Sequence, residues 1–251
     1  MYKRQSETAE IKVNGEITTR IPLLGDTVPV RAHGHFTNTT APWLMQHMRS
    51  NHFVWNNDFS KTRSVGVGGE ISIPWTRTRA SVNVENIQNQ IYFNEQALPA
   101  QFSGNTQVFS VNLEQNFKFR ALHWDNRITY QTSTQESVIP LPKLAISSNL
   151  YFIFRIATLH VQLGVNCDYF TRYRALGFQP ATMAFYNQKE VLVGNYPFMD
   201  AYINFKLSRT RFYVMMSHVN QGLTGSNYFS MPHYPMNPRR FQLGLSIDFA
   251  N

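Results

Sequence analysis

The sequence predicts an all-β fold, an antiparallel up-and-down transmembrane β-barrel. Three observations lead to this fold class. Apolar and polar residues alternate with period two in segments along most of the chain. Short and long connections follow one another in turn. Aromatic residues reach 14% while charged residues are only 15%, well below the quarter that is usual in globular domains.

Six segments carry the clearest alternation. In the segment 159–169, Leu159, Val161 and Leu163 alternate with polar or small neighbours. A period of two places alternate side chains on opposite faces of a strand. The predicted strands are 28–36, 65–75, 109–120, 159–169, 201–208 and 241–249.

The first quarter of the chain is less regular. Residues 11–21 fit either a hairpin that turns at Asn14-Gly15 or one bulged strand. For residues 37–52 we expect a short turn, with TTAP as its best candidate, followed by an irregular strand entering His52–Asn57.

Connection lengths give the predicted orientation. Short connections are expected near 76–79, 120–124, 156–158 and 208–210, and long loops near 94–106, 132–144, 172–198 and 220–239. Outer-membrane barrels have short periplasmic turns and longer extracellular loops. If the last strand descends to the periplasm, the long loops are extracellular.

Hydropathy favours spanning strands over spanning helices. No run approaches about 18 apolar residues, the length that a spanning helix needs, whereas barrel strands need only about 10 alternating residues. A soluble one-sided sheet would give the same alternation, and the sorting of loops by length favours the barrel. Aromatic residues near the predicted strand ends fit interfacial girdles, namely Trp55, Trp75, Phe93, Trp124, Tyr130, Tyr169 and Phe249.

The charge pattern argues against a nucleic-acid partner. The formal net charge is +8, but lysine and arginine are scattered, without a run of five or more. The positive balance fits a hydrated lumen or loops near anionic headgroups. Cys167 is the only cysteine, so an intrachain disulfide is excluded.

We predict no catalytic, cofactor-binding or metal-binding residues. His33 and His35 share a strand face and could bind a metal ion, but histidines in such positions more often simply line a polar surface. The GVGG stretch at 66–69 lies inside a strand and lacks a following GK[ST], so close strand packing explains it better than phosphate binding. The adjacent pair Ser217 and His218 points to opposite faces, against a serine hydrolase site.

The N-terminus is expected to be non-native. MYKRQ is the translation of a transposon sequencing adapter read from a GTG start, and the following residues contain no signal-peptide apolar core. We therefore predict that residues 1–5 are adapter-derived and that 6–251 form part of an N-terminally truncated, larger barrel.

Residues 195–251 resemble the C-terminal region of the Putative porin family of Bacteroidota outer membranes. SHVNQG (217–222) and YFSMPHYPMNPR (228–239) are the most particular matches, supported by SNHFVWNNDF (50–59), ENIQNQIYFN (85–94), ALHWDNRITYQ (121–131) and QPATMAFYNQ (179–188). The resemblance implies a signal peptide, a bacterial outer-membrane location and a barrel larger than this chain.

The predicted function is diffusion of small hydrophilic solutes through a water-filled lumen, with mild anion preference from the positive balance. The candidate pore-lining residues are Arg31, Glu70, Asn112, Lys118, Arg120, Gln162 and Lys206. Two alternatives remain open. One is a non-conducting structural or partner-binding barrel in an envelope complex, and the other is a secreted soluble β-sandwich that binds glycans.

The last strand has a predicted role of its own. Phe241, Leu243, Leu245, Ile247 and Phe249 would face outer-membrane lipid, and Gln242, Ser246 and Asp248 the lumen. A terminal strand ending in an aromatic resembles the signal that the barrel assembly machinery recognises. We also expect this strand to close the barrel against the first strand.

Overall fold

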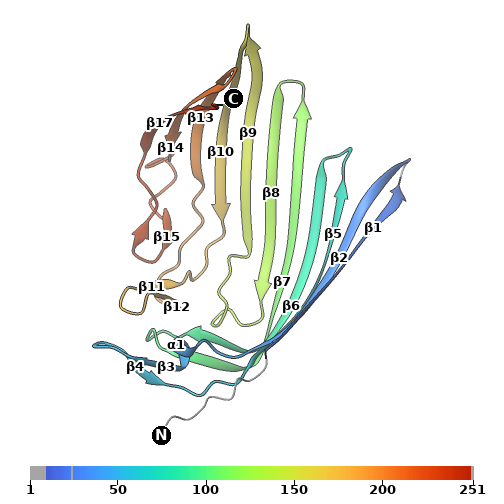
Figure 1. Cartoon of the computed structure of the whole chain (residues 1–251). Coiled ribbons are helices and arrows are strands. Elements are labelled where there is room, and N and C mark those ends of the chain that lie inside the picture. The colour runs from blue at the N-terminus through green and yellow to red at the C-terminus, as the bar shows by residue number, and fades with distance from the viewer. Residues whose placement is uncertain (1–9, 24, 250–251) are drawn as a thin grey trace.

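The chain forms one large antiparallel sheet with a group of loops at one end. The computed structural model describes residues 10–23 and 25–249, so the predicted adapter-derived residues 1–5 lie outside the described part. The main sheet has eleven strands, each paired with its neighbours along the chain. In order they are β1 (Ile11–Leu23), β2 (Asp26–Thr39), β5 (Thr62–Ile73), β6 (Thr78–Phe93), β7 (Pro99–Phe119), β8 (Leu122–Ser133), β9 (Leu144–Ile156), β10 (Leu159–Phe170), β13 (Phe198–Leu207), β14 (Thr210–Ser217) and β17 (Arg240–Ile247) (Figure 1).

The remaining elements all lie in the long connections. They are α1 (Trp43–Gln46), the hairpin β3 (His47–Arg49) and β4 (Val54–Asn56), the hairpin β11 (Gly177–Gln179) and β12 (Ala184–Tyr186), and the pair β15 (Phe229–Met231) and β16 (Tyr234–Pro235). These loops gather at the lower end of the sheet in Figure 1, and the short turns lie at the upper end. The predicted sorting of connections by length is therefore confirmed.

The first quarter corrects two predictions. Residues 11–21 are neither a hairpin nor a bulged strand, because β1 pairs with β2 without a register shift from Ile11 to Leu23. The alternation of apolar and polar residues continues through Asn14-Gly15 without a break. The chain turns later, at Gly25, which has φ +85°. The expected short turn within 37–52 is also wrong: 40–61 is a long connection on the loop side, and its β3–β4 hairpin does not join the main sheet.

The predicted loop 94–106 is mostly strand. Only residues 94–98 connect β6 to β7, and both strands extend far beyond their neighbours. The register shifts between Gln88 and Gln90, where Asn89 has φ +57°. Such a bulge bends a hairpin, and Figure 1 shows the end of the β6–β7 hairpin crossing the base of the sheet.

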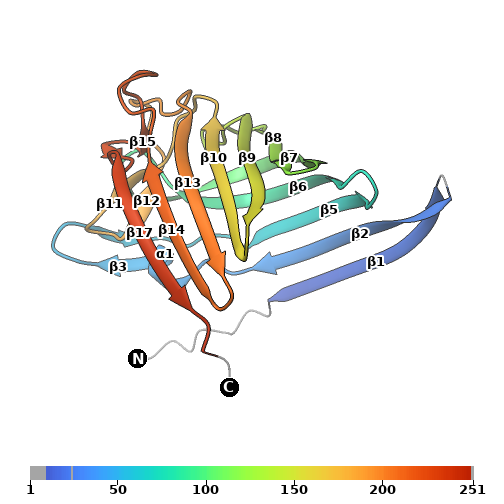
Figure 2. The ribbon, with the colours of Figure 1, turned by 90° about the horizontal axis from the view of Figure 1, so that it is seen from above.

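The sheet curves strongly but does not close. Seen from above, β1 and β17 form its two edges (Figure 2). Within the described strands β17 pairs with β14 alone and β1 with β2 alone, so the sheet is open between these edges, and closure of the last strand against the first strand of a larger barrel stays a prediction. Across residues 10–23 and 25–249, no helix is long and apolar enough to cross a membrane.

The buried core lies mainly among the loops. Tyr196 and Val193 are 4% and 0% exposed, whereas strand side chains such as Ile17 are largely accessible, at 73%. Other buried residues at the loop end include Ala97, Val138, Ala175, Asn187, His218 and Asn220. A globular domain would bury one sheet face against a core, but here both faces of the sheet are open to their surroundings.

Candidate functional site

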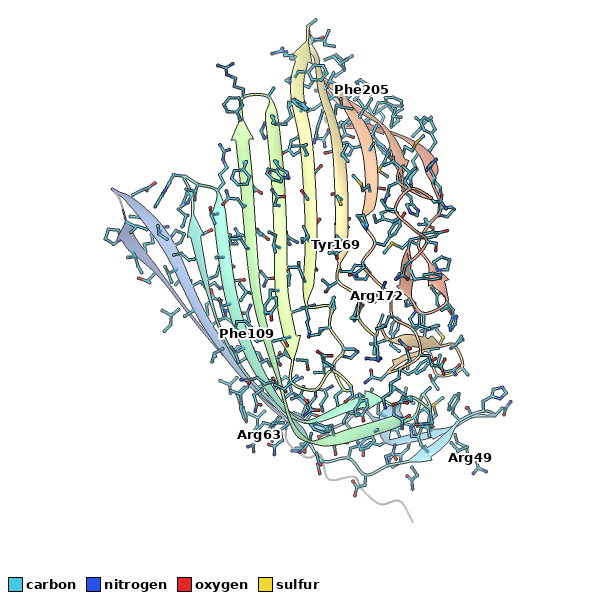
Figure 3. The ribbon with its side chains drawn as sticks, turned by 180° about the vertical axis from the view of Figure 1, so that it is seen from behind. Arg49, Arg63, Phe109, Tyr169, Arg172 and Phe205 are labelled. Carbon is cyan, nitrogen blue, oxygen red and sulfur yellow. The ribbon has the colours of Figure 1, made fainter. Side chains whose placement is uncertain are left out.

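The register separates the sheet into an apolar and a polar face. Residues directly opposite each other in an antiparallel pair share a face, and the alternation stays in phase from β1 to β17. The apolar face is the outer, convex one, seen from behind in Figure 3, where Phe109 and Phe205 are labelled. Val67 and Leu245 on this face are 60% and 65% exposed.

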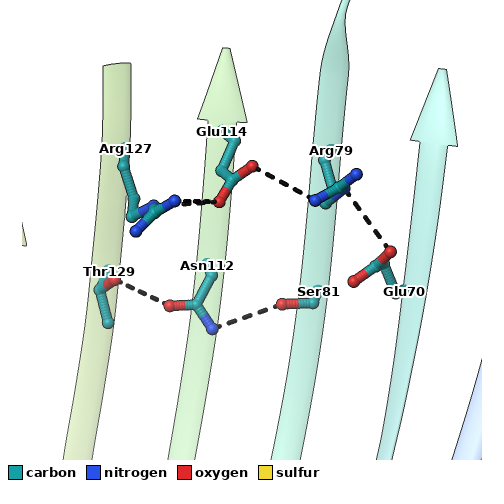
Figure 4. Close-up of polar contacts among 7 residues, drawn as sticks. All are labelled: Glu70, Arg79, Ser81, Asn112, Glu114, Arg127 and Thr129. Carbon is teal, nitrogen blue, oxygen red and sulfur yellow. Dashed lines mark hydrogen bonds and ion pairs between the residues drawn. The ribbon is translucent and has the colours of Figure 1, made fainter. Parts of the chain in front are cut away.

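The polar face lines the concave side of the sheet. Figures 1 and 4 view it from inside the curve. Its hollow contains a cavity of about 480 Å³ bordered by Glu16, Arg31 and Asn83, and another of about 300 Å³ bordered by Asn112 and Arg127.

Six of the seven candidate pore-lining residues lie on this polar face. They are Arg31, Glu70, Asn112, Lys118, Gln162 and Lys206, all placed in main-sheet strands by the register. The seventh is misplaced: Arg120 lies in the β7–β8 turn with φ +52°, and its guanidinium stacks 5.8 Å from the Phe119 ring centroid. The alternation simply ends before residue 120, because the turn begins there. That the six line a pore stays a prediction.

A ladder of alternating charges crosses the polar face from β1 to β8. Its members, one on each strand, are Glu16, Arg31, Glu70, Arg79, Glu114 and Arg127. Arg31 pairs with Glu16 at 2.6 Å, and Arg127 pairs with Glu114 at 2.9 Å. Arg79 lies 3.6 Å from Glu70 and 3.7 Å from Glu114 (Figure 4). The ladder compensates its own charge, and each exposed pair contributes about 0.2–1 kcal/mol.

Hydrogen bonds between polar side chains continue the same surface. Thr129 donates to Asn112 Oδ1 at 2.7 Å, and Asn112 Nδ2 donates to Ser81 at 3.3 Å (Figure 4). Farther along the sheet, Tyr151 donates to Asp125 at 3.0 Å and Tyr202 donates to Asn149 at 2.9 Å. These pairs hold polar groups in fixed positions on a surface that stays accessible.

Glycines on the polar face provide room for aromatic rings from neighbouring strands. A Cβ added at Gly164 would lie 2.5 Å from Tyr202 Cζ and 2.9 Å from Tyr151 Cβ. Gly66 and Gly68 lie beneath the imidazoles of His35 and His33 in the same way. The GVGG stretch is thus a close-packing feature, as predicted.

Near the short turns the polar face becomes strongly cationic. Arg155, His160, Lys206 and Arg211 stand directly opposite one another across β9, β10, β13 and β14. Among the described residues, Asp248 is the acidic partner of this row and lies 3.6 Å from Arg211. Like charges placed directly opposite, as Lys206 and Arg211 are, are unfavourable in a sheet, so this pair costs stability.

Of the two histidines singled out in the sequence, His35 contacts a carboxylate. His35 Nε2 lies 3.5 Å from Glu85, and Ser64 donates to the same carboxylate at 2.5 Å. In the described residues, His, Cys, Asp and Glu side chains form no group of three or more arranged to hold a metal ion.

The SHVNQG motif (residues 217–222) holds the last long loop in place. His218 is fully buried, with φ +55°. Its Nδ1 donates to the Asn237 carbonyl oxygen at 2.9 Å, so a neutral ring accepts from the Tyr196 hydroxyl at Nε2, 2.6 Å away. Arg239 donates to the carbonyl oxygens of Val219 and Gln221 at 3.0 and 2.7 Å. The motif therefore has a structural role, with Ser217 outside this network of contacts to His218.

The long loops join into one assembly, which we call the cap: residues 40–61, 94–98, 134–143, 171–197 and 218–239 with the adjoining ends of β6 and β7. Asn187 N donates to Phe93 O at 2.9 Å, and Lys189 pairs with Glu95 at 2.5 Å. These contacts connect the β6–β7 hairpin to the loop after β10, four strands away in the sheet. The hairpin therefore reaches across the concave side.

Two predicted girdle residues belong to the cap. The Trp55 ring packs edge-on against Phe93 at 6.2 Å, and its Nε1 donates to Leu44 O.

The loop 218–239 also covers part of the polar face, because a cavity of about 440 Å³ lies between Asp168 and Phe198 on one side and Pro235 and Met236 on the other. Sequence reasoning missed the cap, because its contacts join segments far apart in the chain.

A curved antiparallel sheet with an apolar outer face, a hydrated inner face and loops sorted by length is the architecture of a porin-like outer-membrane β-protein. The comparison with protein families agrees. The family model described as Putative porin matches residues 2–251, and the chain belongs to that family. A search of curated proteins found no match.

Proposed function

We propose that the protein is a channel of the bacterial outer membrane through which small hydrophilic solutes diffuse. The observation that carries this proposal is the predominantly polar surface on the concave side of all eleven strands, opposite an apolar outer face. Groups such as Asn112 and Gln162 offer hydrogen bonds to passing solutes and water. Burying such a group in a dry interior without a hydrogen-bond partner would cost several kcal/mol.

The proposed lumen has a mild preference for anions. The charge ladder of β1 to β8 compensates itself, whereas the row Arg155, His160, Lys206 and Arg211 leaves a positive excess near the short turns. A narrow surface of one sign raises the local concentration of the opposite ion.

The orientation and assembly route follow the same proposal. The cap faces the exterior and the short turns face the periplasm. The barrel assembly machinery recognises the C-terminal strand together with the aromatic Phe249, which lies two residues beyond the end of β17 and is 91% exposed.

Bilayer conductance tests the proposed function. The purified full chain, inserted into planar bilayers under a KCl gradient, is expected to give stepwise conductance. The sign of the reversal potential should show that chloride passes more readily than potassium. Clear cation preference would overturn the anion preference, and complete absence of conductance in correctly folded protein would overturn the channel.

The cap favours a second candidate, a non-conducting barrel that binds a partner in an envelope complex. Its buried core, including Asn187 and Tyr196, gives the loops a fixed outer surface. Folded protein without conductance that co-purifies stoichiometrically with another envelope protein would support this candidate. A glycan-binding β-sandwich is disfavoured, because the described strands form one large sheet without a second large sheet packed against it.

A further inference from the structure

We propose that a cavity in the cap binds a small organic anion, a carboxylate or phosphate carried on an apolar body, before it enters the lumen. The inference deepens the proposed channel function and rests on it for the direction of passage. The cavity has a volume of about 520 Å³, within the range of sites for small molecules. It lies between the loops 134–143 and 171–197 and the tip of the β6–β7 hairpin.

The charge of the cavity wall is positive. Lys143, Lys189, Arg172 and Arg174 line it together with two acids, Glu95 and Glu136. Both acids are already paired, Glu95 with Lys189 at 2.5 Å and Glu136 with Lys143 at 3.6 Å. Because both acids are paired with the two lysines, Arg172 and Arg174 carry the excess positive charge of the cavity.

The two arginines are presented by a firmly held segment. Tyr173 and Val193 exchange two backbone hydrogen bonds of 3.0 Å, and Asn195 Oδ1 accepts from Arg172 N at 2.9 Å. Arg174 Nε donates to Lys189 O at 3.3 Å. Arg172 lies just beyond Tyr169 and the end of β10 (Figure 3). A held backbone lowers the entropy cost of binding.

Part of the cavity wall is apolar. Pro140, Leu141 and Leu192 border the cavity. Burial raises the pKa of Tyr173, so this phenol remains neutral and does not repel an anion. Guanidinium groups bind carboxylate and phosphate oxygens with charge-assisted, often bidentate hydrogen bonds. The combination of fixed cations and an apolar wall selects an anion with an apolar body over a bare inorganic ion.

Calorimetric titration of the folded full chain in detergent tests the site. The probes are benzoate, phenyl phosphate, inorganic phosphate and, as the cation of matched size, benzylammonium. Benzoate and phenyl phosphate are expected to compete for one site, inorganic phosphate to bind more weakly, and benzylammonium not to bind. The double substitution Arg172→Gln/Arg174→Gln is expected to weaken benzoate binding by about tenfold or more.

The matched control is Arg77→Gln/Arg120→Gln, which removes two arginine charges from short turns at the end of the sheet away from the cap. It should leave benzoate binding within about twofold, since exposed charges more than a Debye length away are screened. Equal losses in both double variants, or benzylammonium binding as tightly as benzoate, would overturn the site.

The binding measurement and the conductance measurement fail independently. Arginine-dependent benzoate binding without bilayer conductance would retain the site and remove the channel. Conductance without benzoate binding would retain the channel and remove the site. Circular dichroism and heat-modifiable gel mobility of each variant establish that it has folded.

Discussion

Replacing His218 with asparagine should loosen the last long loop while leaving the sheet intact. The side chain is 0% exposed and joins Tyr196 to Asn237 through hydrogen bonds of 2.6 and 2.9 Å. Asparagine tolerates the positive φ of 55° but cannot fill the ring's volume or reach both partners. The lost packing and the lost hydrogen bonds to Tyr196 and Asn237 together cost about 2–4 kcal/mol.

Amide hydrogen exchange measures this cost locally. The free energy of opening the segment 218–239 should fall by that amount, which speeds exchange by roughly 30- to 700-fold for protected amides, since about 1.4 kcal/mol corresponds to tenfold. The amides of β7 and β8, far from the loop in the sheet order, should be unaffected.

His233 provides the matched control. It lies in the same loop with φ +65°, but its side chain is exposed. His233→Asn makes the same chemical change at a similar backbone conformation and should alter exchange by less than about threefold. If the two variants speed exchange equally, or if His218→Asn speeds exchange in β7 as much as in the loop, His218 does not hold the last long loop in the way described.

Three further predictions concern the polar face and the cap. Glu114→Gln leaves Arg127 without its acidic partner while Arg79 keeps Glu70, so the ladder gains one net positive charge, and the anion-to-cation permeability ratio from reversal potentials should rise about twofold after screening; an unchanged ratio would contradict a lumen position. Gly164→Ala forces two tyrosines apart and should lower unfolding free energy by about 1–3 kcal/mol, measured by denaturant unfolding from micelles. Its control is Gly69→Ala, whose new Cβ would lie 3.7 Å from its nearest neighbour and should change stability by less than about 0.5 kcal/mol; equal losses would speak against ring crowding. Glu95→Gln removes the exposed pair with Lys189, worth about 0.2–1 kcal/mol, and should increase open-channel current fluctuations by up to about fivefold; quieter currents would argue against a role of this pair in holding the hairpin in place.

Period-two alternation was enough to predict six of the eleven strands of the main sheet and the division into faces. Leu163 and Gln162 show why: adjacent strand residues must face opposite sides, so one apolar and one polar surface follow from the local sequence. The loop parity followed from length alone. Six candidate lining residues fell on the polar face for the same reason.

The failures arose where local pattern ceases to decide structure. Arg120 continues the alternation on paper, but a turn with positive φ begins there. The β6–β7 hairpin reads as loop after Phe93, because its pairing depends on contacts with Asn187 and Ser60 in other segments. The cap and its cavity likewise come from long-range contacts that a single sequence does not display.

The orientation of the two faces relative to lipid and water is the central claim, and spin-label accessibility along β7 tests it most directly. In a Cys167→Ala background, single labels at Asn112 and Leu113 would be placed in the full chain in lipid bilayers. The label at Leu113 should collide preferentially with oxygen, which partitions into hydrocarbon, and the label at Asn112 with a water-soluble nickel reagent. Extending the labels over 109–114 should show accessibilities that alternate with period two and opposite phase. If both labels respond to the nickel reagent alone, neither face contacts lipid and the account is contradicted.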